Sequence, residues 1–445
     1  MTIFNKRAPW LLLSGDALLF VVSLWLALFL RYGESPDGEI FFAHLAPFSL
    51  LFIIWILVFF ITGLYDKQSV IIKSKLPLYL FQGQVINSVV AVIFFYFVPW
   101  FGISPKTTLF VYLVISLLLI IWWRVYGYFL FVPKVRERTI LVGGGGEVRE
   151  LRREIGDNRR YNIDIVSVID LENAHRDDIL RDIEQSGASV VAMDFYNDKI
   201  HSILPNLYNL IFRRLRFIDI DELYEAVFDR VPLSLIRHNW FLENISASPK
   251  IIYDALKRFM DIAVALVLGI VSLVFYPIVA LAIKLTDGGP VFILQDRIGK
   301  NDKIIHIRKF RSMTEAAQDE NGAPSSQSIT RIGSLIRKTR IDELPQLWNV
   351  VCGDLSLIGP RPELPKFVEI YEKEIPFYGI RHLIKPGLSG WAQLYHRTPP
   401  KFEASNEDTK MKLSYDLFYI KNRSLILDLN IALKTIKEII SRRGI

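Results

Sequence analysis

The chain has 445 residues, of which 51% are hydrophobic, and a formal net charge of +7. Its mean hydropathy of +0.29 excludes an ordinary soluble protein, so we expect a membrane protein with about two to four domains. The single cysteine, Cys352, excludes a disulfide framework, and the seven scattered histidines argue against a zinc site. With membrane segments present, the basic charge favours phosphate and anionic lipid as partners, and we expect no nucleic acid.

Four apolar stretches in the first third of the chain are each near the length of a membrane-spanning helix. They are Trp10–Leu30, Leu45–Leu64, Leu78–Phe101 and Leu109–Trp123. Lysines and arginines precede the first stretch, follow the second and follow the fourth, whereas the first connection is acidic. The positive-inside rule therefore places both ends of a four-helix unit, residues 1–133, in the cytoplasm.

Asp16 lies inside the first apolar stretch. A carboxylate within a membrane helix is often functional, because it is costly there. Near the end of a helix in a bundle, it can equally be a packed structural group. The sequence leaves both interpretations open.

Residues 134–248 change to short apolar runs separated by polar helical segments, a pattern typical of a parallel α/β domain. The runs are Thr139–Gly143, Ile163–Ile169, Ser189–Met193 and Phe217–Ile220. The turn after the first run resembles a dinucleotide fingerprint, but Val148 replaces its last glycine, and Asp170 stands where a ribose-binding acid would be. We favour a Rossmann-like domain with a regulatory or oligomerising role over one that binds NAD.

A fifth apolar stretch, Ile262–Ile283, is interrupted by Pro277 and has positive charge at both ends. A simple crossing would place the remaining basic chain outside, against the positive-inside rule. We therefore predict a helix broken at Pro277 that enters and leaves on the cytoplasmic face, a hairpin of about 257–284. A fifth span is the alternative.

Two adjacent carboxylates, Asp342 and Glu343, follow a basic helix and precede Pro345. Proline fits the first turn of a new helix and disfavours helical geometry at Leu344, so we expect the carboxylates in a break between helices. The new helix should end near Gly353, with its positive end facing the carboxylates, which suits a bound phosphate. A carboxylate can attack phosphorus if cations neutralise the phosphate. The alternative is an acidic N-terminal helix turn.

Basic residues near this pair form a predicted phosphate clamp. Lys309 and Arg311 are two apart in a predicted strand and should share a face, unless they only protect a solvated edge. Arg337 belongs to the basic helix. Arg361 stands between two prolines that fix its backbone, which suits bidentate phosphate binding, although a rigid loop with a surface arginine is the alternative.

The remaining segments predict a mobile loop, a helix, a turn and a terminal helix. The loop is 315–328, and the helix 329–340 should turn Ile332, Leu335 and Ile336 inward. The glycine-rich turn before Trp391 can approach a nucleotide, and Trp391 either stacks on a base or fills the core. The pattern of the stretch 425–440 predicts either an interfacial amphipathic helix or a core helix.

Residues 251–443 closely resemble the bacterial sugar transferase family, the polyprenyl-phosphate phosphoglycosyl transferases. The matching blocks are Lys257-Arg-Phe-Met-Asp261, Gly289-Pro-Val-Phe292, Gln295-Asp-Arg-Ile-Gly299, Lys309-Phe-Arg-Ser-Met313, Ile341-Asp-Glu-Leu-Pro-Gln-Leu-Trp-Asn-Val350, Gly359-Pro-Arg-Pro362 and Lys385-Pro-Gly-Leu-Ser-Gly-Trp-Ala-Gln393. Seven blocks in order over nearly 200 residues make a chance match improbable.

The resemblance implies a ping-pong reaction in which Asp342 attacks a UDP-sugar, releases UMP and passes the sugar phosphate to a polyprenyl phosphate, with undecaprenyl phosphate as the expected carrier. It implies that Glu343 assists with protons or metal, and that Mg²⁺ is held near Asp342. Arg337 and Arg361 would grip phosphates, and Asp261 would belong to the membrane hairpin. We assign nucleotide binding to the block that contains Gly390, Trp391 and Gln393.

The expected architecture is a membrane α-helical bundle, an α/β Rossmann-like domain, and an α/β catalytic domain with a re-entrant membrane helix at 249–445. We expect a bacterial inner-membrane enzyme with its catalytic domain on the cytoplasmic face, and a homodimer. Two rival functions are a membrane-bound NAD-dependent sugar-nucleotide dehydratase and a non-catalytic scaffold or sensor of a glycan assembly complex.

Overall fold

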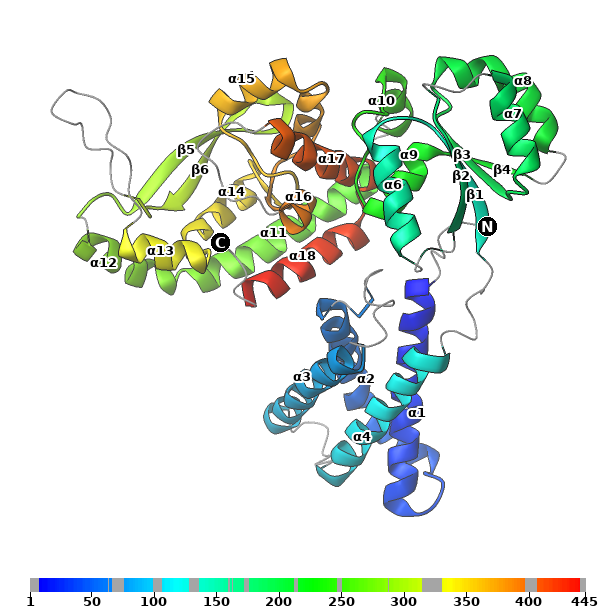
Figure 1. The fold of residues 1–445 in the computed structure, drawn as a ribbon. Helices are drawn as coiled ribbons and strands as arrows, with labels where there is room; N and C mark the ends of the chain where they lie inside the picture. The colour runs from blue at the N-terminus through cyan, green and yellow to red at the C-terminus, as the bar shows by residue number, and fades with distance from the viewer. Residues whose placement is uncertain are drawn as a thin grey trace.

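The structure, a computed structural model, places a bundle of long helices below two α/β units (Figure 1). It describes residues 8–62, 64–65, 76–98, 106–127, 136–158, 161, 163–171, 176–211, 215–245, 250–286, 288–313, 330–396 and 406–440. The predicted loop at 315–328 and the predicted boundary at 249 lie outside these residues.

Four helices of the described chain are long and apolar enough to cross a membrane, as predicted. They are α1 Ala8–Tyr32, α2 Gly38–Ile61, α3 Leu76–Phe97 and α4 Lys106–Trp122, the last continued by the π-turn η2 Trp123–Gly127. Aromatic side chains fill the interior, where Trp55 lies against Phe20 and stacks on Tyr112. The outward faces of the same helices expose leucine, isoleucine, valine and phenylalanine, as expected of surfaces that contact lipid.

Asp16 is fully buried inside this bundle and forms an ion pair with Arg124 of η2. The Tyr65 hydroxyl donates to the same carboxylate at 2.8 Å, and Arg124 also donates to the Leu64 carbonyl at 2.6 Å. The carboxylate therefore joins α1, the segment after α2 and the end of α4. These contacts correspond to the structural alternative for Asp16.

The second unit contains a parallel sheet in the order β2-β1-β3-β4. Its strands are β1 Glu137–Val142, β2 Ile163–Ile169, β3 Val190–Met193 and β4 Arg216–Asp219. Helices α6 Gly146–Asp157 and α9 Ile220–Phe228 pack on one face, and α7 Arg176–Gln185 and α8 Asp198–Ile211 pack on the other. The order is that of flavodoxin-type doubly wound sheets rather than the dinucleotide-binding order, so the parallel α/β prediction is confirmed and the Rossmann detail is not.

The third unit carries the dyad, Asp342 and Glu343. Its first elements are α10 His238–Asn244, α11 Ile251–Ser272, α12 Phe275–Thr286, β5 Phe292–Ile298, the 3-10 turn η3 Lys300–Asp302 and β6 Ile304–Phe310. Next come α13 Arg331–Lys338, the 3-10 turn η4 Ile341–Glu343, α14 Gln346–Cys352, β7 Ser356–Ile358, α15 Pro365–Glu374 and the 3-10 turn η5 Tyr378–Leu383. The last are β8 Gly387–Ser389, α16 Trp391–Tyr395, α17 Asn406–Asn422 and α18 Leu425–Ile440.

The core of the third unit begins before the predicted boundary. Val231 and Trp240 belong to the same buried cluster as Tyr378 and Leu417. Val231 also donates its N–H to the Ser414 carbonyl of α17 at 3.1 Å. Val231 and Trp240, which lie within the range 134–248 predicted for the Rossmann-like domain, therefore pack into the third unit.

Helices α11 and α12 form a broken helix pair that bends by 55°, a geometry that fits either a broken span or the predicted re-entrant hairpin. The break lies at residues 273–274, not at Pro277, which stands in the first turn of α12. Proline is tolerated there because the first N–H groups of a helix have no partner within it. The outer faces of both helices expose large apolar side chains, among them Phe259, Val267 and Leu281.

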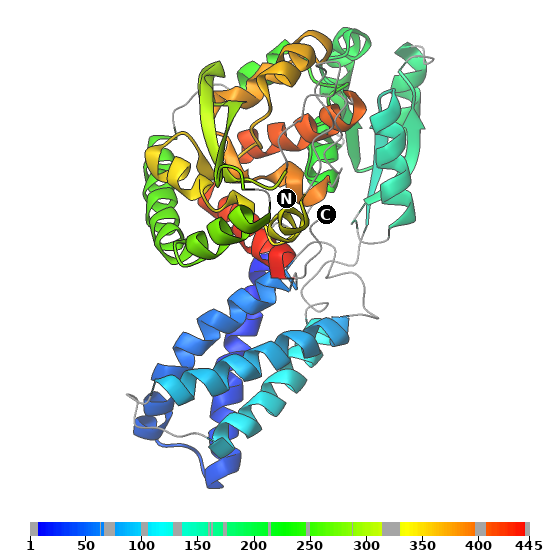
Figure 2. The same cartoon turned by 90° about the vertical axis from the view of Figure 1, so that its left-hand side faces the viewer.

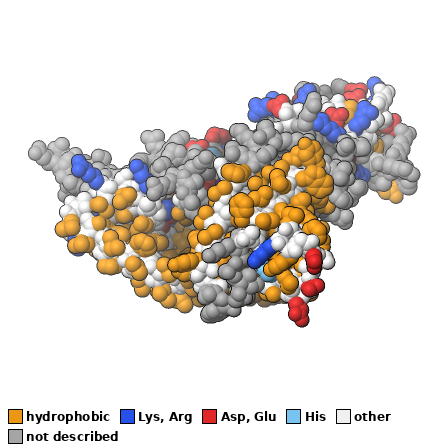
Figure 3. Space-filling model, turned by 90° about the horizontal axis from the view of Figure 1, so that it is seen from below, with side chains coloured by type: hydrophobic (Ala, Val, Ile, Leu, Met, Phe, Trp, Pro, Cys, Tyr) orange, Lys and Arg blue, Asp and Glu red, His pale blue; other side chains and the backbone are white. Residues whose placement is uncertain are grey.

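Helix α18 lies between the membrane bundle and the rest of the third unit (Figures 1 and 2). Lys437 of α18 donates to the carbonyl of Thr62, directly after α2, at 3.2 Å. Ile431 is buried in the core, while Leu429 and Ile436 are exposed. Helix α18 therefore has a core face and an exposed apolar face, which are features of the two predicted alternatives. Hydrophobic side chains cover much of the protein seen from below (Figure 3).

Candidate active site

The dyad occupies the 3-10 turn η4, between α13 and α14, as predicted. Thr330 begins α13 by accepting the N–H of Gly333 at 2.8 Å, and Gly353 ends α14 in the left-handed region at φ 100°. The break itself lies at Arg340, whose φ of 54° is left-handed. A residue with a Cβ is strained in this region, which indicates that the surrounding contacts hold it.

Two details of this segment were predicted wrongly. Leu344 is helical, at φ −54° and ψ −37°, although it precedes proline. Consequently the 3-10 turn leads directly into α14, and the N–H groups of Leu347 and Trp348 donate to the carbonyls of Leu344 and Pro345. The first N–H groups of α14 are thus partly occupied by hydrogen bonds within the chain. Side-chain cations must therefore supply most of the positive charge near the dyad. Leu335 of α13 is also 59% exposed, not turned inward.

Glu343 is held as a carboxylate by arginines. Arg361 donates to its Oε1 at 2.9 Å, and Arg340 lies 3.6 Å from its Oε2. Burial alone would raise the pKa of Glu343, but Arg361, Lys309 and Arg340 outweigh it and lower the pKa to about 2. Glu343 is therefore ionised at every physiological pH.

Asp342 has the opposite electrostatic environment. Burial and the neighbouring charge of Glu343 raise its pKa to about 6, against the opposing effects of Lys309 and Arg337. Two adjacent carboxyl groups with pKa values pushed apart are a pattern of active sites, because the groups can then take different roles. At neutral pH Asp342 is mostly ionised and poorly solvated, which suits a nucleophile.

The structure brings three of the four predicted phosphate-binding cations to the dyad. Lys309, Arg337 and Arg361 all act electrostatically on Asp342. Lys309 stands on β6, where alternate residues Ile305 and Ile307 are buried. Burial, followed by the charge of Arg361, lowers the Lys309 pKa to about 8. The amine is thus a cation that can lose its proton near neutral pH.

Arg311 makes different contacts from Lys309. It follows the last residue of β6, and its Nε donates to the Met313 carbonyl at 3.2 Å. Its guanidinium packs against Gly289, where a Cβ would collide with it. The spacing that predicted a shared face depends on strand geometry, which ends at Phe310, so a phosphate-binding role for Arg311 stays a prediction.

The residues of the predicted nucleotide-binding block make contacts within the folded core. Trp391 is 4% exposed, packs against Tyr395 and Phe418, and donates its indole N–H to the Asp229 carbonyl at 2.8 Å. Gln393 accepts the N–H of Gly390 at 2.8 Å and closes the start of α16. Trp391 therefore fills the core, and nucleotide binding by these residues stays a prediction.

Helix α11 is fixed to the dyad segment by two charged residues. Asp261 accepts the Ser356 hydroxyl at 2.7 Å and the Leu357 N–H at 3.2 Å. Arg258 donates to the carbonyls of Val350 and Val351 at 2.7 and 2.9 Å, satisfying the end of α14. The motif signalled Arg258 only as part of a matching block. These contacts tie α11 to α14 and β7, the two elements that follow the dyad.

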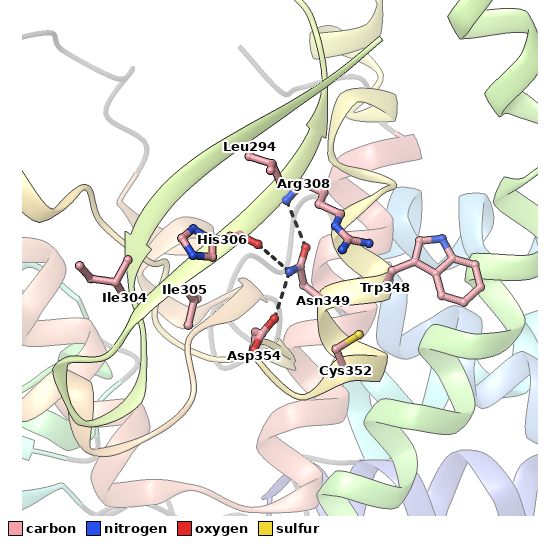
Figure 4. Close-up of a pocket in the computed structure, with 9 residues that line it drawn as sticks. All are labelled: Leu294, Ile304, Ile305, His306, Arg308, Trp348, Asn349, Cys352 and Asp354. Atoms are coloured by element: carbon pink, nitrogen blue, oxygen red, sulfur yellow. Dashed lines mark hydrogen bonds between the residues drawn. The ribbon is translucent and has the colours of Figure 1, made fainter. Parts of the chain in front are cut away.

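A cavity of about 300 Å³ lies between the edge of β6 and α14, lined in part by Leu294, Trp348 and Cys352 (Figure 4). Asn349 holds this edge by accepting the Arg308 N–H at 3.2 Å and donating to the His306 carbonyl at 2.8 Å. Neither carboxylate of the dyad lines the cavity. Asn349 therefore links α14, the helix that follows the dyad, to β6, the strand that carries Lys309.

One donor group was missed because its members are far apart in the sequence. Asp302, Glu372 and His382 bring their ligand atoms within 4.8 Å of one another. His382 Nδ1 lies 2.5 Å from Asp302 and 3.9 Å from Glu372. In the structure the pair of Asp302 and His382 links the β5–β6 turn to η5.

Comparison with known proteins matches this part of the chain. The family model described as bacterial sugar transferase matches residues 252–442. The UDP-N-acetylgalactosamine-undecaprenyl-phosphate N-acetylgalactosaminephosphotransferase of Aeromonas hydrophila is 44% identical over 232 residues, 51% of this chain and 52% of that protein. The uncharacterized sugar transferase EpsL of Bacillus subtilis (strain 168) is 38% identical over 191 residues, 43% of this chain and 90% of EpsL.

A third relative is the UDP-glucose:undecaprenyl-phosphate glucose-1-phosphate transferase of Escherichia coli (strain K12). It is 38% identical over 186 residues, which are 41% of this chain and 39% of that protein. The matched part spans about half the length of the Aeromonas relative. The names of these relatives thus include two different sugars.

Proposed function

This chain belongs to the bacterial sugar transferase family, and on that premise we propose that it transfers a sugar 1-phosphate from a UDP-sugar to polyprenyl phosphate, releasing UMP. The observation that carries the proposal is the dyad, in which cations hold Glu343 ionised while burial raises the pKa of Asp342 to about 6. The names of relatives that use undecaprenyl phosphate support this acceptor.

The reaction proceeds in two displacements at phosphorus. An Asp342 oxygen attacks the β-phosphorus of the UDP-sugar, the bond from that phosphorus to the bridging oxygen breaks, and UMP leaves. A phosphate oxygen of the lipid then attacks the same phosphorus, and Asp342 departs as a carboxylate. The product is a polyprenyl diphosphate sugar, and the enzyme regains its initial charge.

Lys309, Arg337 and Arg361 neutralise the phosphate as it approaches the ionised Asp342. This function is needed because a carboxylate and a diphosphate repel each other. Arg361 stays paired with Glu343, so its fork is oriented before the donor arrives. The electrostatic gain then costs little reorganisation at the moment of reaction.

The residues present fit a Mg²⁺ ion, because Asp342 and Glu343 offer the hard carboxylate oxygens that Mg²⁺ prefers together with substrate phosphates. Asp342 would hold the ion, with Glu343 supporting it. When bound, the ion would supply further positive charge to the diphosphate. Because Arg361 keeps Glu343 ionised, Glu343 would not need to lose a proton before the ion binds.

We place the third unit at the cytoplasmic surface of a bacterial inner membrane, with α11 and α12 as a re-entrant hairpin. The 55° bend and the exposed apolar faces of these helices support this placement over a simple fifth span. The contact of Lys437 with the end of α2 supports a position of the exposed face of α18 near the bilayer surface. A soluble sugar nucleotide and a lipid phosphate can meet there.

The rival NAD-dependent dehydratase is disfavoured by the second unit. Val148 is buried under the sheet at the position where the fingerprint requires its last glycine. Its side chain fills the space that lets helix and strand approach closely. Nothing in the described residues favours that reaction.

The test is UMP release from a panel of UDP-sugars by the full chain in membranes containing polyprenyl phosphate. We expect release with at least one donor, and its loss in Asp342→Asn but not in Asp182→Asn, an exposed carboxylate of the second unit. Release that persists in Asp342→Asn would refute the role of Asp342. No release with any donor would favour the scaffold or sensor.

A further inference from the structure

Arg381, on η5, is a buried arginine that none of the proposed steps uses. Its side chain is 4% exposed and lies 2.9 Å from the Asp416 carboxylate of α17, itself 2% exposed. Its Nη1 donates to the Tyr378 hydroxyl at 2.5 Å. Its Nη2 also donates to the backbone carbonyl of Arg361 at 2.9 Å. The guanidinium of this buried ion pair therefore also donates to the backbone carbonyl of Arg361, the arginine that pairs with Glu343.

The loop around Arg361 has three consecutive carbonyls, and each accepts a hydrogen bond from another element. Pro360 accepts the N–H of Gly387 at 2.9 Å, and Arg361 accepts Arg381. Pro362 accepts Nη1 of Arg297 at 3.2 Å. The two prolines have fixed φ and no N–H to donate. The backbone of Arg361 is therefore restrained in rotation and in position.

Buried ion pairs contribute little net stability, because the cost of removing two charges from water offsets their attraction. The distinctive contact of the pair formed by Arg381 and Asp416 is therefore the bond to the Arg361 carbonyl. The guanidinium can make this bond while facing Asp416 and Tyr378, because its donors form a planar fork. A lysine ammonium has one nitrogen and cannot span all three positions.

We propose that Arg381, oriented by Asp416 and Tyr378, is a positioning residue that fixes the backbone of Arg361 so that its guanidinium meets Glu343. The effect of this arrangement on sugar transfer rests on the proposed function. Its effect on Glu343 does not, because the pairing of Arg361 with Glu343 exists without substrate. The two consequences can therefore be measured separately.

The first measurement follows the contact between Arg361 and Glu343 at pH 7.5, without turnover. In the full chain in lipid nanodiscs, the infrared carboxylate band that Glu343→Gln removes identifies Glu343. In the wild type we expect this band at the position of a carboxylate that accepts from a guanidinium, because Arg361 donates to Oε1 of Glu343 at 2.9 Å. In Arg381→Lys we expect the band to shift toward the position that it takes in Arg361→Ala, since Arg361 is less firmly held against Glu343.

The matched control is Arg230→Lys. Arg230 is also a buried arginine, paired with Glu150 at 2.7 Å, but it lies where the second unit meets α17, and its contacts with the described residues do not include the Arg361 loop. The substitution should leave the Glu343 band unchanged. If Arg381→Lys does not fold, Tyr378→Phe should shift the band by a smaller amount. An unchanged band in a folded Arg381→Lys or Tyr378→Phe variant overturns the inference.

The second measurement is a double-mutant cycle on kcat/KM for UMP release. Arg381→Lys should lower kcat/KM about tenfold in the wild type and less than twofold in an Arg361→Ala background, because its effect passes through Arg361. Equal losses in both backgrounds would indicate a merely structural role and contradict the proposal. Absence of UMP release in the wild type would refute the proposed function, while the infrared result would still decide the role of Arg381.

Discussion

Replacing Asp342 with asparagine should stabilise the protein while abolishing its reaction. The pKa of Asp342 is raised from 3.8 to about 6, so the folded state disfavours the charged carboxylate. This shift corresponds to a cost of about 3 kcal/mol above pH 7. Partial solvent exposure reduces the expected value to about 2 kcal/mol. Asparagine has the same shape and no charge, and it removes that cost.

The sign of the pH dependence follows from the direction of the shift. Because the folded pKa lies above the unfolded one, the cost is fully present above about pH 6 and disappears as the pH falls below about 4. The advantage of Asp342→Asn should therefore fall to about half at pH 5. Thermal unfolding of the full chain in nanodiscs, measured at pH 7.5 and pH 5, tests both expectations.

At pH 7.5 we expect Asp342→Asn to raise the melting temperature of the third unit by about 4–8 °C. Asp182→Asn, which changes an exposed carboxylate of the same type, should raise it by less than about 1 °C. A lower melting temperature for Asp342→Asn, or a gain that is equal at both pH values, would refute the reasoning about burial at this site.

Three further expectations concern rate, membrane packing and lipid contact. The pH profile of kcat/KM should fall below about pH 6, where Asp342 gains its proton, and above about pH 8, where Lys309 loses its charge; a flat profile from pH 5 to 9 would contradict this. Asp16→Asn should destabilise the bundle by about 3 kcal/mol because it leaves Arg124 buried without its partner, seen as a lower unfolding temperature that a double replacement by apolar residues recovers. Ile436→Glu on α18 should raise KM for the lipid acceptor several-fold without changing KM for the UDP-sugar, whereas Ile436→Leu should leave both unchanged.

Segments with strong local signals were predictable from the sequence. The four spanning helices follow from uninterrupted apolar runs, and the four parallel strands follow from short apolar runs bounded by turns. Proline and glycine correctly placed the dyad between α13 and the end of α14 at Gly353. These features depend on residues close to one another in the chain.

The errors arose where tertiary contacts decide the outcome. Pro345 predicted a non-helical Leu344, but packing keeps that residue helical. The break between α11 and α12 precedes Pro277, because proline fits within the first turn of α12. Leu335 lies on the exposed face of its helix despite an inward prediction. Helix preferences of ordinary residues amount to less than about 1 kcal/mol each, which packing can override.

The contacts that support the dyad and its neighbouring segments could not have been predicted from the spacing of residues in the sequence. Arg381 reaches the Arg361 carbonyl across twenty positions, and Asp416 comes from a helix still further along the chain. Arg258 satisfies the end of α14 from a distance of more than ninety positions. Each of these residues looks like an ordinary charged side chain in the sequence. Only the folded chain shows that Arg258 supports α14 and that Arg381 and Asp416 support the loop around Arg361.

Asp342 is proposed to carry the sugar phosphate between donor and acceptor. The most direct test incubates the full chain with a radiolabelled UDP-sugar that it uses, without polyprenyl phosphate, and then locates the label by peptide mass spectrometry. We expect one labelled sugar phosphate per chain on the peptide containing Asp342, lost when the lipid acceptor is added. Label on another residue, or UMP release with no label on the protein at any time, would contradict the account.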